Sequence, residues 1–172
     1  MAELLLAHGA SGTAASMRPH VDGLRLRGIG ARAITLPKGN AERAVPVFAR
    51  LLAAAPPGSS TGGHSYGGRV ASMLAASGDA PTPAALVLLS YPLHRPGHPD
   101  DLRTEHWSRI TCPTLLLSGD ADPFARAALL RDAARLIPRA ELHTYPRVGH
   151  GLAPVLDDAL DRIARFLRDA AP

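Results

Sequence analysis

The chain has 172 residues, of which 46% are hydrophobic and 20% are charged. These proportions are typical of one globular domain and argue against a disordered chain or a membrane protein. The 19 basic and 15 acidic residues give a net charge of +4, but they are interspersed and form no basic run, so the sequence does not indicate nucleic-acid binding.

The N-terminal segment and the single cysteine restrict the class further. The stretch MAELLLAHG lacks a basic region and its apolar run is too short for a signal peptide, and nowhere do eighteen apolar residues run together. We therefore expect a cytoplasmic protein that does not contact a membrane. Cys112 is the only cysteine, so no internal disulfide is possible, and we expect a small packed side chain.

The expected elements alternate between apolar strands and helical segments. In chain order they are a strand at 3–9, a helix at 16–27, a strand at 31–37, a helix from the N-cap Asn40 to Ala55, strands at 84–92 and 113–120, a helix at 123–137, a strand at 140–146 and a helix at 153–169. A further strand and helix flank a Gly-rich motif near residue 65. This alternation predicts one α/β domain over residues 1–172, with a doubly wound, mostly parallel six-stranded sheet of order 2-1-3-4-5-6.

The Gly-rich motif is Gly63-His64-Ser65-Tyr66-Gly67, a Gly-x-Ser-x-Gly pattern between the expected third strand and a helix. In a nucleophile elbow the serine lies in a strained turn, and side chains two residues to either side would collide, so glycine is needed there. The pattern alone also fits a Gly-rich turn with a capping serine. The preceding residues have little β propensity, so only the motif places the third strand.

A nucleophilic serine needs a base and an orienting acid, which follow it in the order acid, then histidine, on this kind of sheet. His150 follows the last expected strand, and both Asp120 and Asp122 follow the strand before it. The carboxyl ends of parallel strands share one edge, so we expect these side chains near Ser65. Each has a simpler alternative: Asp122 before Pro123 fits a helix cap, Asp120 fits a turn, and His150 fits an ordinary loop.

The first expected strand neighbours the third, which places the turn after it beside Ser65. We expect the backbone N–H groups of Ala10 and Tyr66 to form an oxyanion hole there. His8, Tyr91 and His94 are expected in the substrate pocket, although a structural hydrogen bond explains His94 equally well. Prolines interrupt the histidines of residues 94–106 and no acidic ligand accompanies them with site spacing, so no metal ion is predicted.

Together these motifs give the chain a resemblance to the α/β-hydrolase family over nearly its whole length. The matching stretches are HGA at 8–10, GHSYG at 63–67, SGDADPF at 118–124 and GHG at 149–151. Residues 91–107, YPLHRPGHPDDLRTEHW, resemble the dienelactone-hydrolase-like branch that contains testis-expressed protein thirty and the hydrolase-like part of nonspecific lethal complex subunit three. Family members usually carry one or two strands before the first strand found here.

The resemblance implies a serine hydrolase that needs no cofactor and cleaves a small carboxylic ester or thioester through an acyl-enzyme. Ser65 would be the nucleophile, His150 the base and Asp122 the acid, since the family's acid lies three residues after Gly119. The alternative is a catalytically silent scaffold of the same fold. Residues 91–111 are too few for a lid domain, and the second strand is expected as an exposed edge through which a homodimer could form.

Overall fold

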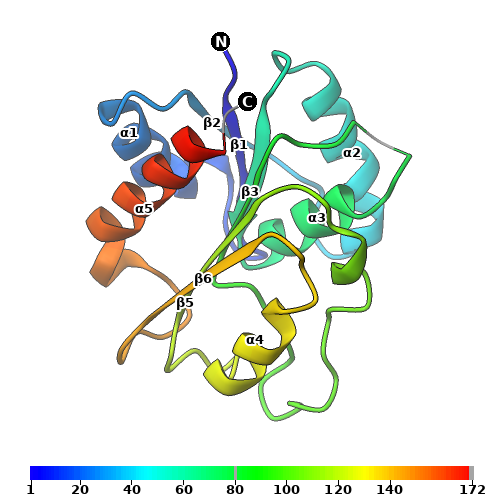
Figure 1. Cartoon of the computed structure of the whole chain (residues 1–172), viewed down its shortest axis with the longest axis vertical. Helices are drawn as coiled ribbons and strands as arrows, with labels where there is room; N and C mark the ends of the chain where they lie inside the picture. The colour runs from blue at the N-terminus through cyan, green and yellow to red at the C-terminus, as the bar shows by residue number, and fades with distance from the viewer. Residues whose placement is uncertain (80, 171–172) are drawn as a thin grey trace.

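A six-stranded parallel sheet forms the centre of the protein (Figure 1). The computed structural model describes residues 1–79 and 81–170, and in it the strand order is β2-β1-β3-β4-β5-β6 with every pairing parallel. The predicted fold class and strand order are therefore confirmed. The strands are β1 (Leu4–Ala7), β2 (Ala31–Ile34), β3 (Ser60–His64), β4 (Leu86–Leu89), β5 (Thr114–Gly119) and β6 (Ala140–Tyr145).

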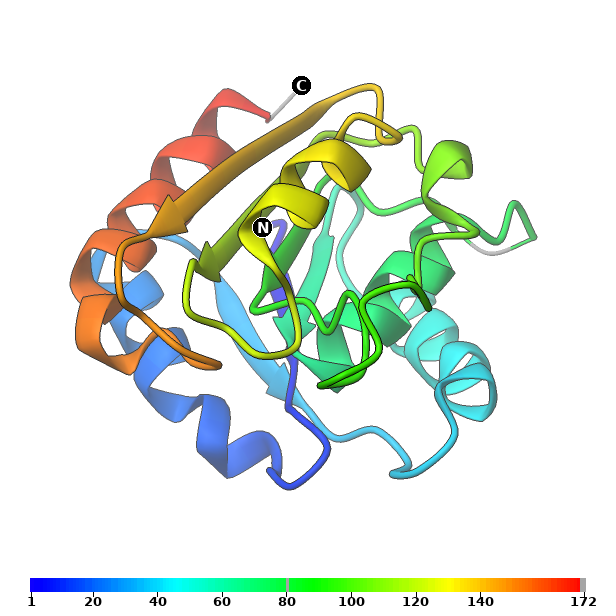
Figure 2. The ribbon, with the colours of Figure 1, turned by 90° about the horizontal axis from the view of Figure 1, so that it is seen from below.

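Helices cover both faces of the sheet (Figure 2). Helices α1 (Arg18–Leu26) and α5 (Leu156–Asp169) cover one face, and α2 (Ala41–Ala53), α3 (Tyr66–Ala75) and α4 (Ala127–Ala134) cover the other. Successive side chains of a strand point to opposite faces. Leu4 and Leu6 of β1 therefore pack in the core under α1 and α5, and Leu5 packs in the core under α2, α3 and α4. This two-sided burial explains why β1 and β4 are continuous apolar runs.

The helix boundaries follow local signals in one case and depart from them in another. Helix α2 begins after Asn40, whose side-chain oxygen accepts a hydrogen bond from the Arg43 backbone N–H at 2.9 Å, as expected for an N-cap. Helix α4 was expected from residue 123 but begins at Ala127. The cap alternative for Asp122 is therefore wrong, because four residues separate it from the helix.

Strand β3 is present although its composition does not favour one. Its glycines are required by space: a Cβ on Gly62 would lie 2.5 Å from the carbonyl oxygen of Val87 on the neighbouring β4. Real Cβ atoms do not approach a backbone oxygen so closely. The close approach of the two strands therefore selects glycine against strand propensity.

The long connection between β4 and β5 forms no lid domain. It contains only one short 3-10 helix, Trp107–Arg109, and packs against the body of the protein. Trp107 is fully buried and lies edge to face against Tyr91 with ring centroids 4.8 Å apart. The segment contributes Pro92 and Arg103 to the wall of the cavity at the carboxyl edge of the sheet but forms no separate domain over it.

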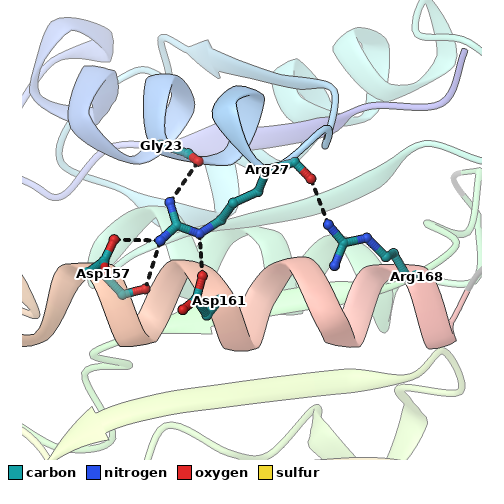
Figure 3. A network of polar contacts seen from close by, with 5 residues as sticks. All are labelled: Gly23, Arg27, Asp157, Asp161 and Arg168. Atoms are coloured by element: carbon teal, nitrogen blue, oxygen red, sulfur yellow. Dashed lines mark hydrogen bonds and ion pairs between the residues drawn. The ribbon is translucent and has the colours of Figure 1, made fainter.

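Charged residues join α1 to α5 on the opposite side of the sheet from α3 (Figure 3). The Arg27 guanidinium donates to Asp157 and Asp161 on α5, and Arg168 donates to the Arg27 carbonyl oxygen at 2.6 Å. We call Arg27, Asp157 and Asp161 the α1–α5 clamp. It fixes the two helices whose ends reach the carboxyl edge of the sheet.

Two further expectations concern surfaces. Strand β2 is an edge strand, as predicted, and β6 is the other edge; association of two copies through an edge stays a prediction. None of the helices within residues 1–79 and 81–170 is both long enough and apolar enough to cross a lipid bilayer.

Candidate active site

Ser65 occupies a sharp turn between β3 and α3. Its φ of 48° and ψ of −113° lie outside the regions that residues with a Cβ prefer, and its N–H donates to the Leu89 carbonyl oxygen at 2.8 Å. A Cβ on Gly63 would lie 2.5 Å from the Gly67 carbonyl carbon, and one on Gly67 would lie 2.6 Å from the carbonyl oxygen of Ala7. The flanking glycines therefore provide the space that this turn requires.

Three side chains from distant parts of the sequence form a continuous hydrogen-bonded chain. The Ser65 Oγ lies 2.9 Å from the His150 Nε2, and the His150 Nδ1 lies 2.8 Å from the Asp122 Oδ2. A carboxylate can only accept a hydrogen bond, so Nδ1 carries the proton and Nε2 is left to accept one from the serine hydroxyl. The carboxylate thereby fixes the imidazole tautomer that a general base needs.

The two candidate acids are placed differently. The Asp122 side chain has no exposed surface and also accepts a hydrogen bond from the Phe124 N–H at 2.8 Å. Asp120 is exposed and accepts from the Arg147 N–H at 2.6 Å, which braces the loop before His150. The structure thus brings Asp122, and not Asp120, to the imidazole.

A cavity of about 850 Å³ opens at the carboxyl edge of the sheet and contains the Ser65 and His150 side chains in its wall. Ala10 and Tyr66 line the same cavity. The Tyr66 N–H is at the first turn of α3, where no intrahelical acceptor exists, and the Ala10 N–H donates to no backbone carbonyl within the described residues. Two backbone donors are therefore available beside the serine.

Two histidines of the cavity wall lack hydrogen-bond partners on one nitrogen. His64 Nε2 and His20 Nδ1 are both buried without a partner among the described residues. Burial, with a smaller contribution from the nearby His150, lowers the pKa of His64 to about 4, and burial also lowers the pKa of His20. Both imidazoles are accordingly neutral at neutral pH.

The three residues expected to line the pocket lie behind its wall instead. His8 is fully buried, and its Nε2 accepts from the Leu36 N–H at 3.2 Å. Tyr91 donates its hydroxyl to the Arg103 carbonyl oxygen at 2.6 Å, and the His94 Nε2 accepts from the Arg126 N–H at 3.1 Å. None of the three is among the described residues that line the cavity, so the expectation of pocket contact is corrected, and for His94 the alternative of a structural hydrogen bond is the one observed.

Sequence reasoning missed two arginines of the cavity wall, Arg69 and Arg103. Arg69 lies four residues after Ser65, and its N–H donates to the Ser65 carbonyl oxygen at 3.0 Å. Residues four apart share one side of a helix, so this spacing could have pointed to Arg69. Arg103 comes from the irregular connection between β4 and β5, where no periodic pattern could have found it.

Comparison with known proteins gives one family and many similar folds. A sequence model of the alpha/beta hydrolase domain family matches residues 38–168. The Est1E protein of Butyrivibrio proteoclasticus, solved with ferulic acid bound, has a TM-score of 0.82 at 16% identity, covering 99% of this chain and 89% of that one.

Two other similar structures have comparable scores. The monoacylglycerol lipase of Paleococcus ferrophilus has a TM-score of 0.79 at 14% identity, covering 98% of this chain and 94% of its own. The dienelactone hydrolase of Anabaena variabilis has a TM-score of 0.78 at 19% identity, covering 100% of this chain and 88% of its own. At such identities the likeness establishes the fold alone.

Proposed function

The chain belongs to the alpha/beta hydrolase family, and we propose that it is a serine hydrolase that cleaves a small carboxylic ester or thioester through an acyl-enzyme. The observation that carries the proposal is the unbroken chain of hydrogen bonds from Ser65 through His150 to the buried Asp122. A serine hydroxyl is a weak nucleophile unless a positioned base removes its proton, and this arrangement supplies that base.

In the first half of the reaction, the Ser65 Oγ forms a bond to the substrate carbonyl carbon while its proton passes to the His150 Nε2. Negative charge moves onto the carbonyl oxygen, and the Ala10 and Tyr66 N–H groups would stabilise it. The tetrahedral intermediate then breaks its bond to the alcohol or thiol, which leaves with the proton from His150. Asp122 stays ionised and stabilises the imidazolium formed in between.

In the second half, His150 removes a proton from a water molecule, and the resulting hydroxide attacks the acyl carbon. The bond to Ser65 breaks, the serine recovers its proton from His150, and a carboxylic acid is released. Every proton and electron pair is accounted for by these side chains and water, so the proposed reaction needs no cofactor.

The similar proteins support the class of reaction and no particular substrate. A monoacylglycerol lipase and a dienelactone hydrolase both take their names from substrates with an ester bond. The narrower resemblance of residues 91–107 to the branch of testis-expressed protein thirty and the cytoplasmic location stay predictions. A silent scaffold of the same fold is the other outcome that the experiment below distinguishes.

The decisive experiment uses a fluorophosphonate probe, which reacts covalently with activated serines, on the purified protein. We expect labelling of the native chain and its loss in Ser65→Ala, with at least about a 10³-fold fall in kcat/KM for 4-nitrophenyl acetate. Ser77→Ala, an exposed serine outside the cavity, is the matched control and should label normally. Undiminished labelling of Ser65→Ala would remove the serine from the mechanism, and no labelling of the native chain would favour the scaffold.

A further inference from the structure

One wall of the active-site cavity carries two positive charges. Arg69 leaves α3 one helical turn after Ser65, and Arg103 approaches from the connection between β4 and β5. Both guanidinium groups are partly buried, and both line the same cavity as the serine and His150. A ligand that reaches Ser65 therefore passes close to these two groups.

The protein holds the Arg103 backbone firmly while leaving its side chain uncommitted. The Arg103 N–H donates to the Leu93 carbonyl oxygen at 2.8 Å, and its carbonyl oxygen accepts the Tyr91 hydroxyl at 2.6 Å. Tyr91 is itself locked against the buried Trp107. Within the described residues the Arg103 guanidinium forms neither a hydrogen bond nor an ion pair, so an anchored backbone presents a free cation to the cavity.

Arg69 is also incompletely satisfied. Its Nε is buried without a hydrogen-bond partner in the described part of the chain. Its acidic neighbour is Glu42 at the cavity rim, 3.7 Å from the guanidinium and 61% exposed, which is a long and solvated contact. A donor that is buried without an acceptor costs free energy, so the protein alone leaves this guanidinium incompletely paired where it lines the cavity.

The charges of this wall do not cancel. Burial and then the neighbouring Arg69 and Arg95 lower the pKa of Arg103, and the smaller opposing effect of Asp101 does not offset them. Arg95 is compensated by Asp101 at 3.1 Å, and Glu42 offsets one of the two wall arginines. The lowered pKa values of His20 and His64 mean that these two histidines add no positive charge at neutral pH, so Arg103 is the wall cation left without an acidic partner among the residues described, and it suits a ligand with a single negative charge.

We propose that the substrate is an ester or thioester that carries a carboxylate, which Arg103 and Arg69 bind while Ser65 attacks the carbonyl carbon. The proposal rests on the hydrolase function above and names its substrate class. Arginine presents paired donors that match the two oxygens of a carboxylate, and such charge-assisted bonds are about twice as strong as neutral ones. Binding at one end would fix the position of the scissile carbonyl at the other.

The test compares kcat/KM for matched charged and neutral esters, with spontaneous hydrolysis subtracted. One arm places the carboxylate on the acyl side, using mono-4-nitrophenyl adipate and its monoamide. The other places it on the alcohol side, using 4-carboxyphenyl acetate and 4-carbamoylphenyl acetate. In one arm at least, we expect the carboxylate to be preferred by about tenfold or more, the effect of one charge-assisted hydrogen bond.

Three variants test whether the preference for the charged ester depends on the arginines of the cavity wall. Arg103→Gln should lower the charged-to-neutral ratio about tenfold, whereas Glu42→Gln should raise it because the opposing negative charge is removed. Arg135→Gln is the matched control, since Arg135 is exposed, is paired with Asp132 and lies outside the cavity lining; it should leave the ratio unchanged.

Ratios at or below one in both arms would overturn the proposal, as would a ratio that Arg103→Gln leaves intact. Failure of the hydrolase function has a different signature, which is that no ester is turned over at all. In that case, calorimetric titration of Ser65→Ala with monophenyl adipate and its monoamide still decides the question. Tighter binding of the carboxylate, lost in Arg103→Gln, supports the charged subsite, and equal binding of the two overturns it.

Discussion

Two sets of contacts between acidic and basic side chains join parts of the chain that are distant in sequence, and they differ in how much water reaches them. The Asp122 side chain is fully buried where it accepts from His150. In the α1–α5 clamp, Asp157 is 91% exposed and Asp161 is 58% exposed where they accept from Arg27. Water and salt screen the clamp, whereas a buried acid keeps its full influence on the imidazole.

Neighbouring groups also hold the Asp122 carboxylate and the His150 ring in place. The Phe124 N–H donates to Asp122, and the Phe124 ring lies against His150 with ring centroids 4.3 Å apart. In the clamp (Figure 3) the Arg27 side chain is mostly buried, but both of its acids are exposed to water. The comparison teaches that an acid and a base side by side can control the geometry of a reaction when they are enclosed, and otherwise add a modest amount of stability.

The largest expected effect follows from replacing the buried acid. Asp122→Asn keeps the size of the side chain but allows its amide to face the His150 Nδ1, which stabilises the wrong imidazole tautomer. We expect kcat to fall by about 10⁴-fold, the loss known for this replacement in other serine triads. Steady-state turnover of 4-nitrophenyl acetate measures it.

Asp120→Asn is the matched control, since the two residues share a loop. The asparagine oxygen can still accept from the Arg147 N–H, so turnover should change little. Melting temperatures of both variants separate a catalytic loss from unfolding. An inactive Asp120→Asn beside an active Asp122→Asn would reverse the assignment of the acid.

A smaller effect concerns His64, which lines the cavity and is partly buried, and whose Nε2 is buried without a partner among the described residues. Burial lowers its folded pKa from 6.5 to about 4. Above pH 6.5 the imidazole is neutral in both states, and its contribution to stability is complete. As the pH falls from 6.5 towards 4, the unfolded chain binds a proton that the folded chain does not, so the free energy of unfolding decreases, by at most about 3 kcal/mol.

His64→Gln should therefore flatten the loss of stability between pH 6.5 and 4, as measured by urea unfolding at several pH values. His143→Gln is the control, because His143 lies on the edge strand β6 and is more accessible to water. Its removal should alter the pH dependence less. Equal slopes for the native chain and His64→Gln would show that the ring is protonated as easily folded as unfolded.

The arrangement of the sheet was predictable from the sequence because most strands and helices follow one periodicity each, and the Gly-x-Ser-x-Gly motif placed β3, whose composition does not favour a strand. The exact start of α4 was not, because Asp122 and Pro123 form a good local capping signal that the chain uses differently. The Asp122 side chain accepts from the Phe124 N–H and also from His150, 28 residues away. The local hydrogen bond therefore forms as the capping signal predicts, but the helix begins only at Ala127.

The candidate site likewise contains residues that the sequence predicted and residues that it did not. Ser65, Asp122 and His150 stand in motifs, so their types and order could be read before their contacts were known. The cavity wall could not be read, because Arg103 is placed by Tyr91 and Trp107 through contacts within an irregular loop. The polar residues expected in the pocket, such as His8, satisfy backbone groups behind it.

The smallest expected effect concerns the α1–α5 clamp, whose acids are exposed to water. Arg27→Gln removes the cation that contacts both clamp acids, and we expect the melting temperature at low salt to fall by about 2–4 °C. The difference from the native chain should shrink in 1 M NaCl, where the screening length is about 3 Å.

Arg135→Gln is the control, since that side chain is 82% exposed and its contact with Asp132 is 3.6 Å, so its replacement should lower the melting temperature less than Arg27→Gln does. A salt-independent loss would mean that Arg27 acts through the hydrogen bond that it donates to the Gly23 carbonyl oxygen within α1, at 3.0 Å, and through packing of its stem. The clamp would then resemble the enclosed pair more closely than its exposed acids indicate.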